Sequence, residues 1–173
     1  MKSLSLHISE KLIINKNSSH VKYYPKTKDE LKELVEKLIE ERGDKANLND
    51  IETAEITDMS KLFSKSKFNG DISEWNVANV TDMTQMFYHS KFNGDISNWD
   101  VSNVRKMSHM FEWSKFDGDI SGWDVSNVET MTCMFFCAKF NKNISNWNID
   151  KLCSTIDTFR DCPIKDEYKP KFK

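Results

Sequence analysis

The sequence has no apolar run close to the roughly 20 residues that a membrane-spanning helix needs. It also has no block of charge of one sign, because the formal net charge is −2 and basic residues are interspersed with acidic ones. This balance gives no electrostatic basis for binding DNA, RNA or an anionic membrane. We therefore expect no nucleic-acid partner and no membrane span.

An export signal is missing as well. Charge returns at Glu10 and Lys11 within the N-terminal segment, and no small-residue cleavage site follows it. If Met1 is the native start, we expect a cytoplasmic protein; if a signal has been removed, we expect it at the cell surface or secreted. The four cysteines contain no C-x-x-C pair, and free thiols are the default without export.

Catalytic motifs are absent from the sequence. No serine or cysteine stands in a nucleophile motif, there is no glycine-rich phosphate loop, and the four histidines share no repeat position. An enzyme needs one asymmetric constellation of reactive groups, whereas the aspartates here recur with a fixed period. We expect no enzymatic activity and no cofactor.

The sequence does contain a strong internal repeat of 24 residues, which reads F-N-G-D-I-S-x-W-D-V-S-N-V-x-x-M-x-x-M-F-x-x-S-K. Five columns share this period, which excludes coincidence, and stacked copies would bury one continuous core. The columns are Trp75, Trp99, Trp123 and Trp147; Phe63, Phe87, Phe111, Phe135 and Phe159; Met59, Met83, Met107 and Met131; Phe68, Phe92, Phe116 and Phe140; and Ile72, Ile96, Ile120 and Ile144.

Each unit contains two hydrophobic patterns. Ile96, Trp99 and Val101 have the L-x-x-L-x-L spacing of leucine-rich repeats and predict a short strand. The next apolar residues have helical spacing after Ser102, a suitable N-cap, and the Asn93-Gly94 step predicts the turn between coils. The residues with helical spacing are Val104, Met107, Met110 and Phe111.

The predicted fold is therefore α/β, a right-handed solenoid of the leucine-rich-repeat type with short parallel strands, short helices and a helical N-terminal cap. Residues 1–46 would form the cap, with a possible strand or hairpin and a helix over 28–42 that begins at Thr27 and ends at Gly43. Residues 47–162 would form about five coils, and residues 163–173 a C-terminal tail or cap. Asn79, Asn103 and Asn127 are expected to bond to the backbone of adjacent turns.

The segment FNGDISNWDVSNVRKMSHMF resembles the BspA-like leucine-rich repeats, in particular the family called domain of unknown function 285. The resemblance covers about residues 56–160. It implies a bacterial or phage origin and, for surface-anchored relatives, adhesion to proteins of a host or neighbouring cell. It implies no catalytic residues.

Two surfaces are candidate binding sites. On the predicted helix face the repeats differ from one another, and exposed aromatic residues there are typical of interfaces. The candidates on that face are Tyr88, His89, His109, Glu112, Trp113 and Phe136. On the predicted strand face Asp100 and Asp124 belong to a ladder of acids and amides, which is either a polar groove or a solvated sheet.

A metal site is not favoured. Cys133 and Cys137, with Asp157 and Asp161 in the same columns one coil later, form a weak candidate for zinc. Packed helices lie about 8–10 Å apart, which is a long reach for such short side chains.

The leading prediction for function is a non-enzymatic scaffold for protein–protein recognition that uses the solenoid surface. One alternative is a carbohydrate- or cell-surface-binding adhesin module. Another is a structural subunit of a larger assembly, with self-association through the coil ends.

Overall fold

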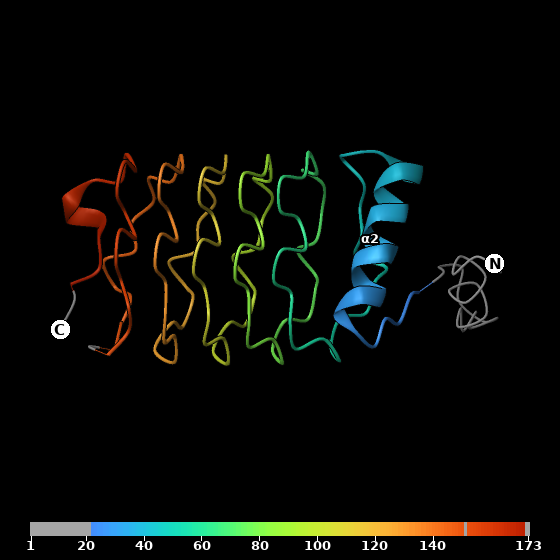
Figure 1. Cartoon of the computed structure of the whole chain (residues 1–173), viewed down its shortest axis with the longest axis horizontal. Helices are drawn as coiled ribbons and strands as arrows, with labels where there is room; N and C mark the ends of the chain where they lie inside the picture. Colours follow the sequence, from blue (N-terminus) through green and yellow to red (C-terminus); the bar gives the residue numbers. More distant parts are fainter. Residues whose placement is uncertain (1–21, 151, 172–173) are drawn as a thin grey trace.

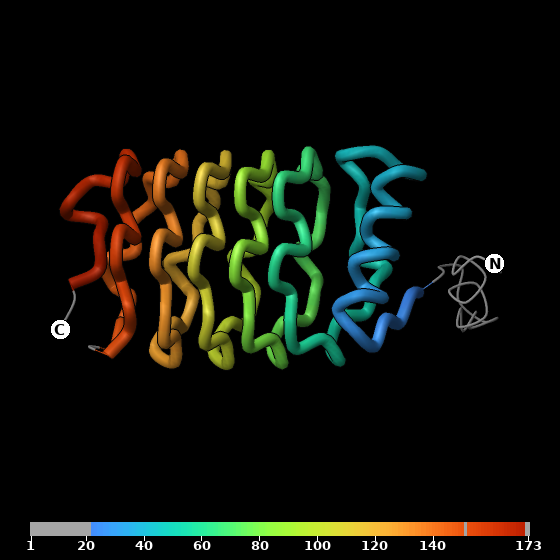
Figure 2. Tube along the Cα trace, in the orientation of Figure 1, coloured from blue at the N-terminus to red at the C-terminus, as the bar shows by residue number. Residues whose placement is uncertain are grey.

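The computed structural model describes residues 22–150 and 152–171, which form a stack of narrow coils along one axis (Figures 1 and 2). Helix α2 (Lys28–Arg42) lies at one end of the stack and the short 3-10 helix η1 (Asp166–Tyr168) at the other. Residues 24 positions apart pair in parallel bridges, from Asp58–Asp82 to Thr130–Ser154. The columns of the sequence are therefore columns in space.

Helix α2 covers the first coil. The Oγ1 atom of Thr27 accepts a hydrogen bond from the backbone N–H of Glu30 at 3.2 Å, which caps the first turn. Gly43, with a φ of 87°, ends the helix, as the sequence predicts. The apolar side of the helix joins the same core as the coils through Leu31, Leu34, Val35 and Leu38. The strand or hairpin expected before Tyr24 falls almost entirely outside the described residues.

The α/β prediction is wrong for the part of the chain that the structure describes, because no strand or sheet forms there and the parallel pairs are isolated bridges. The reason is that side chains, and not backbone N–H groups, make the hydrogen bonds described next between neighbouring coils along the predicted strands. The indole N–H of each core tryptophan donates to a backbone carbonyl of the preceding coil, as Trp99 does to Ile72 at 3.2 Å. The amide of Asn103 donates in the same way to Ala78 at 2.8 Å. Side chains thus make links that a sheet would make with its backbone.

The asparagine prediction is confirmed at all three positions. The Nδ2 atoms of Asn79, Asn103 and Asn127 each donate to a backbone carbonyl 25 residues earlier, at 2.8 Å. The equivalent tryptophan bonds of Trp75, Trp123 and Trp147 measure 2.9–3.1 Å. The asparagine column therefore bonds to carbonyls that no backbone N–H of the described residues reaches, whereas the carbonyls bonded by the tryptophans also accept a backbone N–H, as Ile72 does from Trp75.

The predicted short helices are also wrong. Each consists instead of a segment that we call a turn row, namely residues 59–66, 83–90, 107–114, 131–138 and 155–162. In the first row the N–H groups of Leu62, Ser64 and Ser66 close three successive turns on carbonyls three residues earlier. The N–H groups of the residues between them donate to the following coil instead. For example, the N–H of Phe63 donates to the carbonyl of Met86 at 2.9 Å. A helix needs those same groups for its own bonds.

Every turn row contains two residues in the left-handed region of φ. Their φ values lie between 53° and 63°, and none of these residues is glycine. Such a conformation costs roughly 1–3 kcal/mol for a residue with a side chain, unless the surroundings fix it. Two of the turns in each row need this left-handed conformation at their third residue, and these two turns lie close together in the sequence. The residues are Lys61 and Lys65, Gln85 and His89, His109 and Trp113, Cys133 and Cys137, and Asp157 and Asp161.

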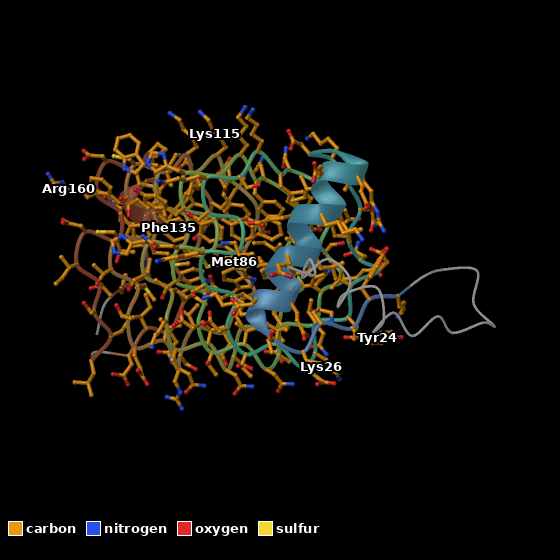
Figure 3. All side chains as sticks on the ribbon, turned by 45° about the vertical axis from the view of Figure 1, so that its right-hand side comes forward. Tyr24, Lys26, Met86, Lys115, Phe135 and Arg160 are labelled. Atoms are coloured by element: carbon orange, nitrogen blue, oxygen red, sulfur yellow. The ribbon has the colours of Figure 1, made fainter. Side chains whose placement is uncertain are left out.

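The core consists of stacked aromatic columns. Successive rings of Phe63, Phe87, Phe111 and Phe135 lie 5.5 Å apart, and a second column, which contains Phe92, repeats at 6.2–6.3 Å. Such offset stacks add stabilisation to the burial of large apolar surfaces. Figure 3 shows Phe135 and Met86 inside the stack, and Lys115 and Arg160 projecting from its edge.

The glycines of the repeat are not needed for a left-handed backbone, because the only glycine with a positive φ is Gly43, which lies before the repeat. Gly70, Gly94 and Gly118 instead leave room for neighbouring atoms that a Cβ atom would meet. A Cβ atom on Gly94 would lie 2.8 Å from the ring of Phe92 and 2.9 Å from the carbonyl oxygen of Gly70. Both distances are shorter than real Cβ contacts. The structure has neither a turn nor a bend at Asn93-Gly94, so the turn predicted there is wrong, and Gly94 allows a close approach instead.

This close approach predicts that Gly94→Ala destabilises the fold by about 1–3 kcal/mol, the usual range for overpacking. Gly122→Ala is the matched control, because a Cβ atom there meets nothing within 4 Å. Urea unfolding of the two variants measures the difference. Equal stability of the two would contradict the crowding at Gly94.

The left-handed residues give a second prediction. Gln85→Val should lower the free energy of unfolding by roughly 1–3 kcal/mol, because a β-branched side chain is poorly tolerated at a φ of 58°. Gln85→Gly should lose little or nothing. Thr84→Val, at the neighbouring position outside the left-handed region, serves as the control, and the three variants are compared by chemical denaturation.

Candidate interaction surface

The turn rows expose the side chains in which the repeats differ. The third and seventh residues of each row are the left-handed ones, and they alternate with buried residues such as Met86 and Phe87. Because the backbone is fixed by the bonds between rows, the outward side chains are free to vary without disturbing the core. The candidate residues of the sequence analysis that lie on the predicted helix face all belong to these rows.

The structure brings four of these candidates together in a line that crosses three coils. The ring of His89 stacks on Trp113 at 5.5 Å with an interplanar angle of 16°, and Tyr88 meets His89 edge-on at 4.7 Å. Trp113 in turn meets Phe136 edge-on at 6.0 Å. We call this line, Tyr88, His89, Trp113 and Phe136, the aromatic strip.

Trp113 is the exposed tryptophan of the strip. Its exposed fraction is 49%, whereas those of the core tryptophans Trp75, Trp99, Trp123 and Trp147 are 3–4%. An indole that is half exposed and already held by two neighbouring rings needs little reordering to bind a partner. Rigid aromatic side chains of this kind supply contact area at a low cost in entropy.

Arg160 extends the strip to a fourth coil, and the list of candidate residues did not include it. Its guanidinium carbon lies 5.6 Å from the centre of the Phe136 ring, a cation–π contact. Ion pairs of 3.6 Å to Asp157 and 3.7 Å to Asp161 also hold the side chain. The signal was present in the sequence, because Arg160 occupies the same repeat column as Tyr88 and Phe136.

His109 and Glu112 lie beside the strip and not within it. The Nδ1 atom of His109 makes a short contact with the carboxylate of Glu112, and the pair is partly buried. The carbonyl of Glu112 accepts the backbone N–H of His89 at 2.8 Å. These two residues therefore support the backbone under Trp113 and contribute polar groups at the margin of the aromatic strip.

Asp100 and Asp124 stabilise turns. The Oδ1 atom of Asp100 accepts hydrogen bonds from the N–H and the hydroxyl of Ser102, at 3.1 and 2.6 Å. That of Asp124 accepts from the N–H of Ser126 at 3.0 Å. Bonds from the serines lower the pKa of both carboxyl groups. Their occupied oxygens favour the reading of this face as a solvated scaffold, and Ser102 caps no helix.

These lowered pKa values predict a loss of stability in acid. An aspartate whose folded pKa lies below its unfolded value, about 3.9, stabilises the fold above that value and ceases to do so as the pH falls through the folded pKa. The free energy of unfolding should therefore fall below about pH 4. In Asp100→Asn with Asp124→Asn this fall should be shallower, because an uncharged amide can still accept the bond, as Asn76 does from Ala78 at 3.1 Å. Denaturant titrations between about pH 5 and 3 measure the slope, and identical slopes would exclude the two carboxylates as its source.

The weak zinc candidate does not assemble. In residues 22–150 and 152–171, no three His, Cys, Asp or Glu side chains come together in a group that could hold a metal ion. Cys133 and Cys137 are free, and desolvation, followed by neighbouring carboxylates, raises the pKa of both thiols. Thiols that keep their protons are poor ligands and poor nucleophiles.

No helix of the described part is long and apolar enough to cross a bilayer.

The stacked coils with constant inward columns and variable outward columns define a repeat protein. The chain belongs to the family described as "Mycoplasma protein of unknown function, DUF285", whose model matches residues 30–147 and, in a second match, residues 88–168. The match extends to this family and not to the BspA-like leucine-rich repeats as such. No curated protein and no solved structure matches the chain.

Proposed function

We propose that this protein is a non-enzymatic scaffold for protein–protein recognition and that the aromatic strip is its binding surface. The observation that carries the proposal is the half-exposed Trp113, which stacks on His89 and meets Phe136 edge-on on adjacent coils. Tryptophan, tyrosine and arginine dominate the energetics of protein interfaces, and all three occur in this line.

The arrangement of charge around the strip supports a protein partner. Arg160 lies at one end, held by carboxylates, and the pair His109–Glu112 lies along one side. An apolar centre with polar groups at its margin is the usual anatomy of a protein interface. The strip contains no arrangement of nucleophile, base and orienting group, which supports a role in binding over a role in catalysis.

Two substitutions test the proposal directly. Trp113→Ser with Phe136→Ser should weaken the binding of a captured and purified partner roughly 30-fold or more, the loss expected when interface hot spots are truncated. The partner is obtained by affinity capture from the native cell and then titrated against both proteins. The melting temperature should change little, because the two side chains lie outside the buried core.

The matched control is Lys115→Ser, an exposed residue of the same coil that lies outside the aromatic strip. It should leave affinity unchanged. If the double variant unfolds, the two aromatic residues belong to the core; if it binds normally, the partner uses another surface. A glycan array probed with the same variants tests for a carbohydrate ligand, and strip-dependent glycan binding would replace the protein-partner proposal with the adhesin alternative.

A further inference from the structure

The last turn row, residues 155–162, presents a set of backbone donors that nothing in the described part of the chain satisfies. In the four earlier rows the N–H groups of the third, fifth and seventh residues donate to carbonyls of the next row, and that of the first residue donates to the carbonyl just before that row. In the fifth row the equivalent groups belong to Thr155, Asp157, Phe159 and Asp161. Within residues 22–150 and 152–171 these four N–H groups have no acceptor.

This row nevertheless keeps the conformation of a row that is covered by another. Asp157 and Asp161 have φ values of 53° and 55°, within the range of the earlier rows, although no bond to a following row holds them there. Residues 163–171, the described part of the segment after the row, do not supply the acceptors, because they pack alongside residues 140–144: the N–H of Ile144 donates to the carbonyl of Tyr168 at 3.0 Å. The donors are therefore arranged for an acceptor before one arrives.

Apolar side chains flank the donors. Leu152 is 84% exposed and Ile156 is 67% exposed, and Phe159 is only partly buried at the end of its aromatic column. The position of Ile156 holds a serine or threonine in every earlier row, such as Thr132. An exposed isoleucine at the one row without a neighbour is consistent with a surface that becomes covered.

The chemistry of this end restricts its partner. The row exposes donors only, so two copies of this end would oppose donor to donor. The other end of the stack is occupied by helix α2, whose buried side chains join the core and whose Lys28 side chain bonds to Asp58 at 3.1 Å, just before the first turn row. The fifth row of one copy would therefore meet this helix, and not a turn row, at the other end of a second copy. The exposed edge of a β-strand alternates donors with acceptors and would match only half of its groups.

We propose that the fifth turn row binds another polypeptide that presents a turn row of the same kind, with carbonyls on alternate residues and apolar side chains toward Leu152 and Ile156. The bound segment would continue the stack by one coil. This surface faces along the stack axis and shares the fifth row with the aromatic strip only through Arg160, whose guanidinium lies against Phe136. Variants of Trp113 and of Ile156 therefore test the two proposals separately.

A peptide of one repeat provides the probe. We would use residues 117–140 as a synthetic peptide with Cys133→Gly and Cys137→Gly, which eases its left-handed positions, and a scrambled peptide as the control. The amide hydrogens of Thr155, Asp157, Phe159 and Asp161 should exchange quickly in the free full-length protein and slowly with the peptide bound. Those of Met131, Cys133, Phe135 and Cys137 should be slow in both states.

Two variants complete the experiment. Ile156→Thr restores the residue type of the earlier rows at an exposed position, so it should fold normally and weaken peptide binding roughly tenfold or more. Trp113→Ser should leave peptide binding unchanged. No protection of the four amides, protection by the scrambled peptide, or protection that depends on Trp113 would each overturn the proposal. Concentration-dependent protection without peptide, with a dimer in light scattering, would overturn it in favour of self-association.

Discussion

The structure depends on one arrangement, in which alternate backbone N–H groups of the first four turn rows donate to carbonyls of the following coil, four bonds at each junction. Each such bond contributes only about 1 kcal/mol, but the set repeats and fixes the rows in register. Because these N–H groups point along the stack, they are unavailable for a helix. The remaining N–H groups close tight turns within the row, and those turns place two residues per row in the left-handed region. Because these N–H groups bond to carbonyls of the following coil, the described coils contain no helices. The left-handed residues and the outward direction of the variable side chains have the same cause.

The period of the repeat was the most informative part of the sequence. The capping residues Thr27 and Gly43 correctly predicted where helix α2 begins and ends. The period correctly predicted that residues such as Trp123 and Trp147 lie above one another and that Asn103 bonds to a neighbouring coil. It also placed Tyr88, His89, Trp113 and Phe136 on adjacent coils, although their mutual contacts depend on side-chain directions that a period does not contain. The division of the chain into cap, repeats and tail stays a prediction.

The secondary structure could not be obtained in the same way. Apolar residues at Met107, Met110 and Phe111 suit one face of a helix, and they equally suit the buried side of three consecutive turns. The usual signal for a left-handed turn is glycine or asparagine, but here those positions hold residues such as Gln85, His109 and Cys133. The strands failed for another reason: the indole of Trp99 and the amide of Asn103 bond to the preceding coil, so an L-x-x-L-x-L spacing is compatible with a coil that has no sheet. The unsatisfied N–H donors of the fifth row could not be predicted either, because a side-chain pattern contains no information about the hydrogen bonds of backbone amides.

The spacing of the stacked phenylalanine rings can also be compared with that of a peptide ligand that lies along the molecule. Ring centres are 5.5 Å apart from Phe63 to Phe87 to Phe111 and 6.2–6.3 Å apart in the column that contains Phe92, whereas an extended peptide advances about 6.6–6.8 Å for every two residues. The side chains of a strand laid parallel to the axis would therefore advance roughly 0.3–1.3 Å farther than the coils at each step and would lose their match with the coils as the contact lengthened. A long linear ligand with evenly spaced side chains is therefore a poor match for this surface, and a short contact of three or four coils, the span of Tyr88 to Arg160, is close to the limit that such a mismatch permits.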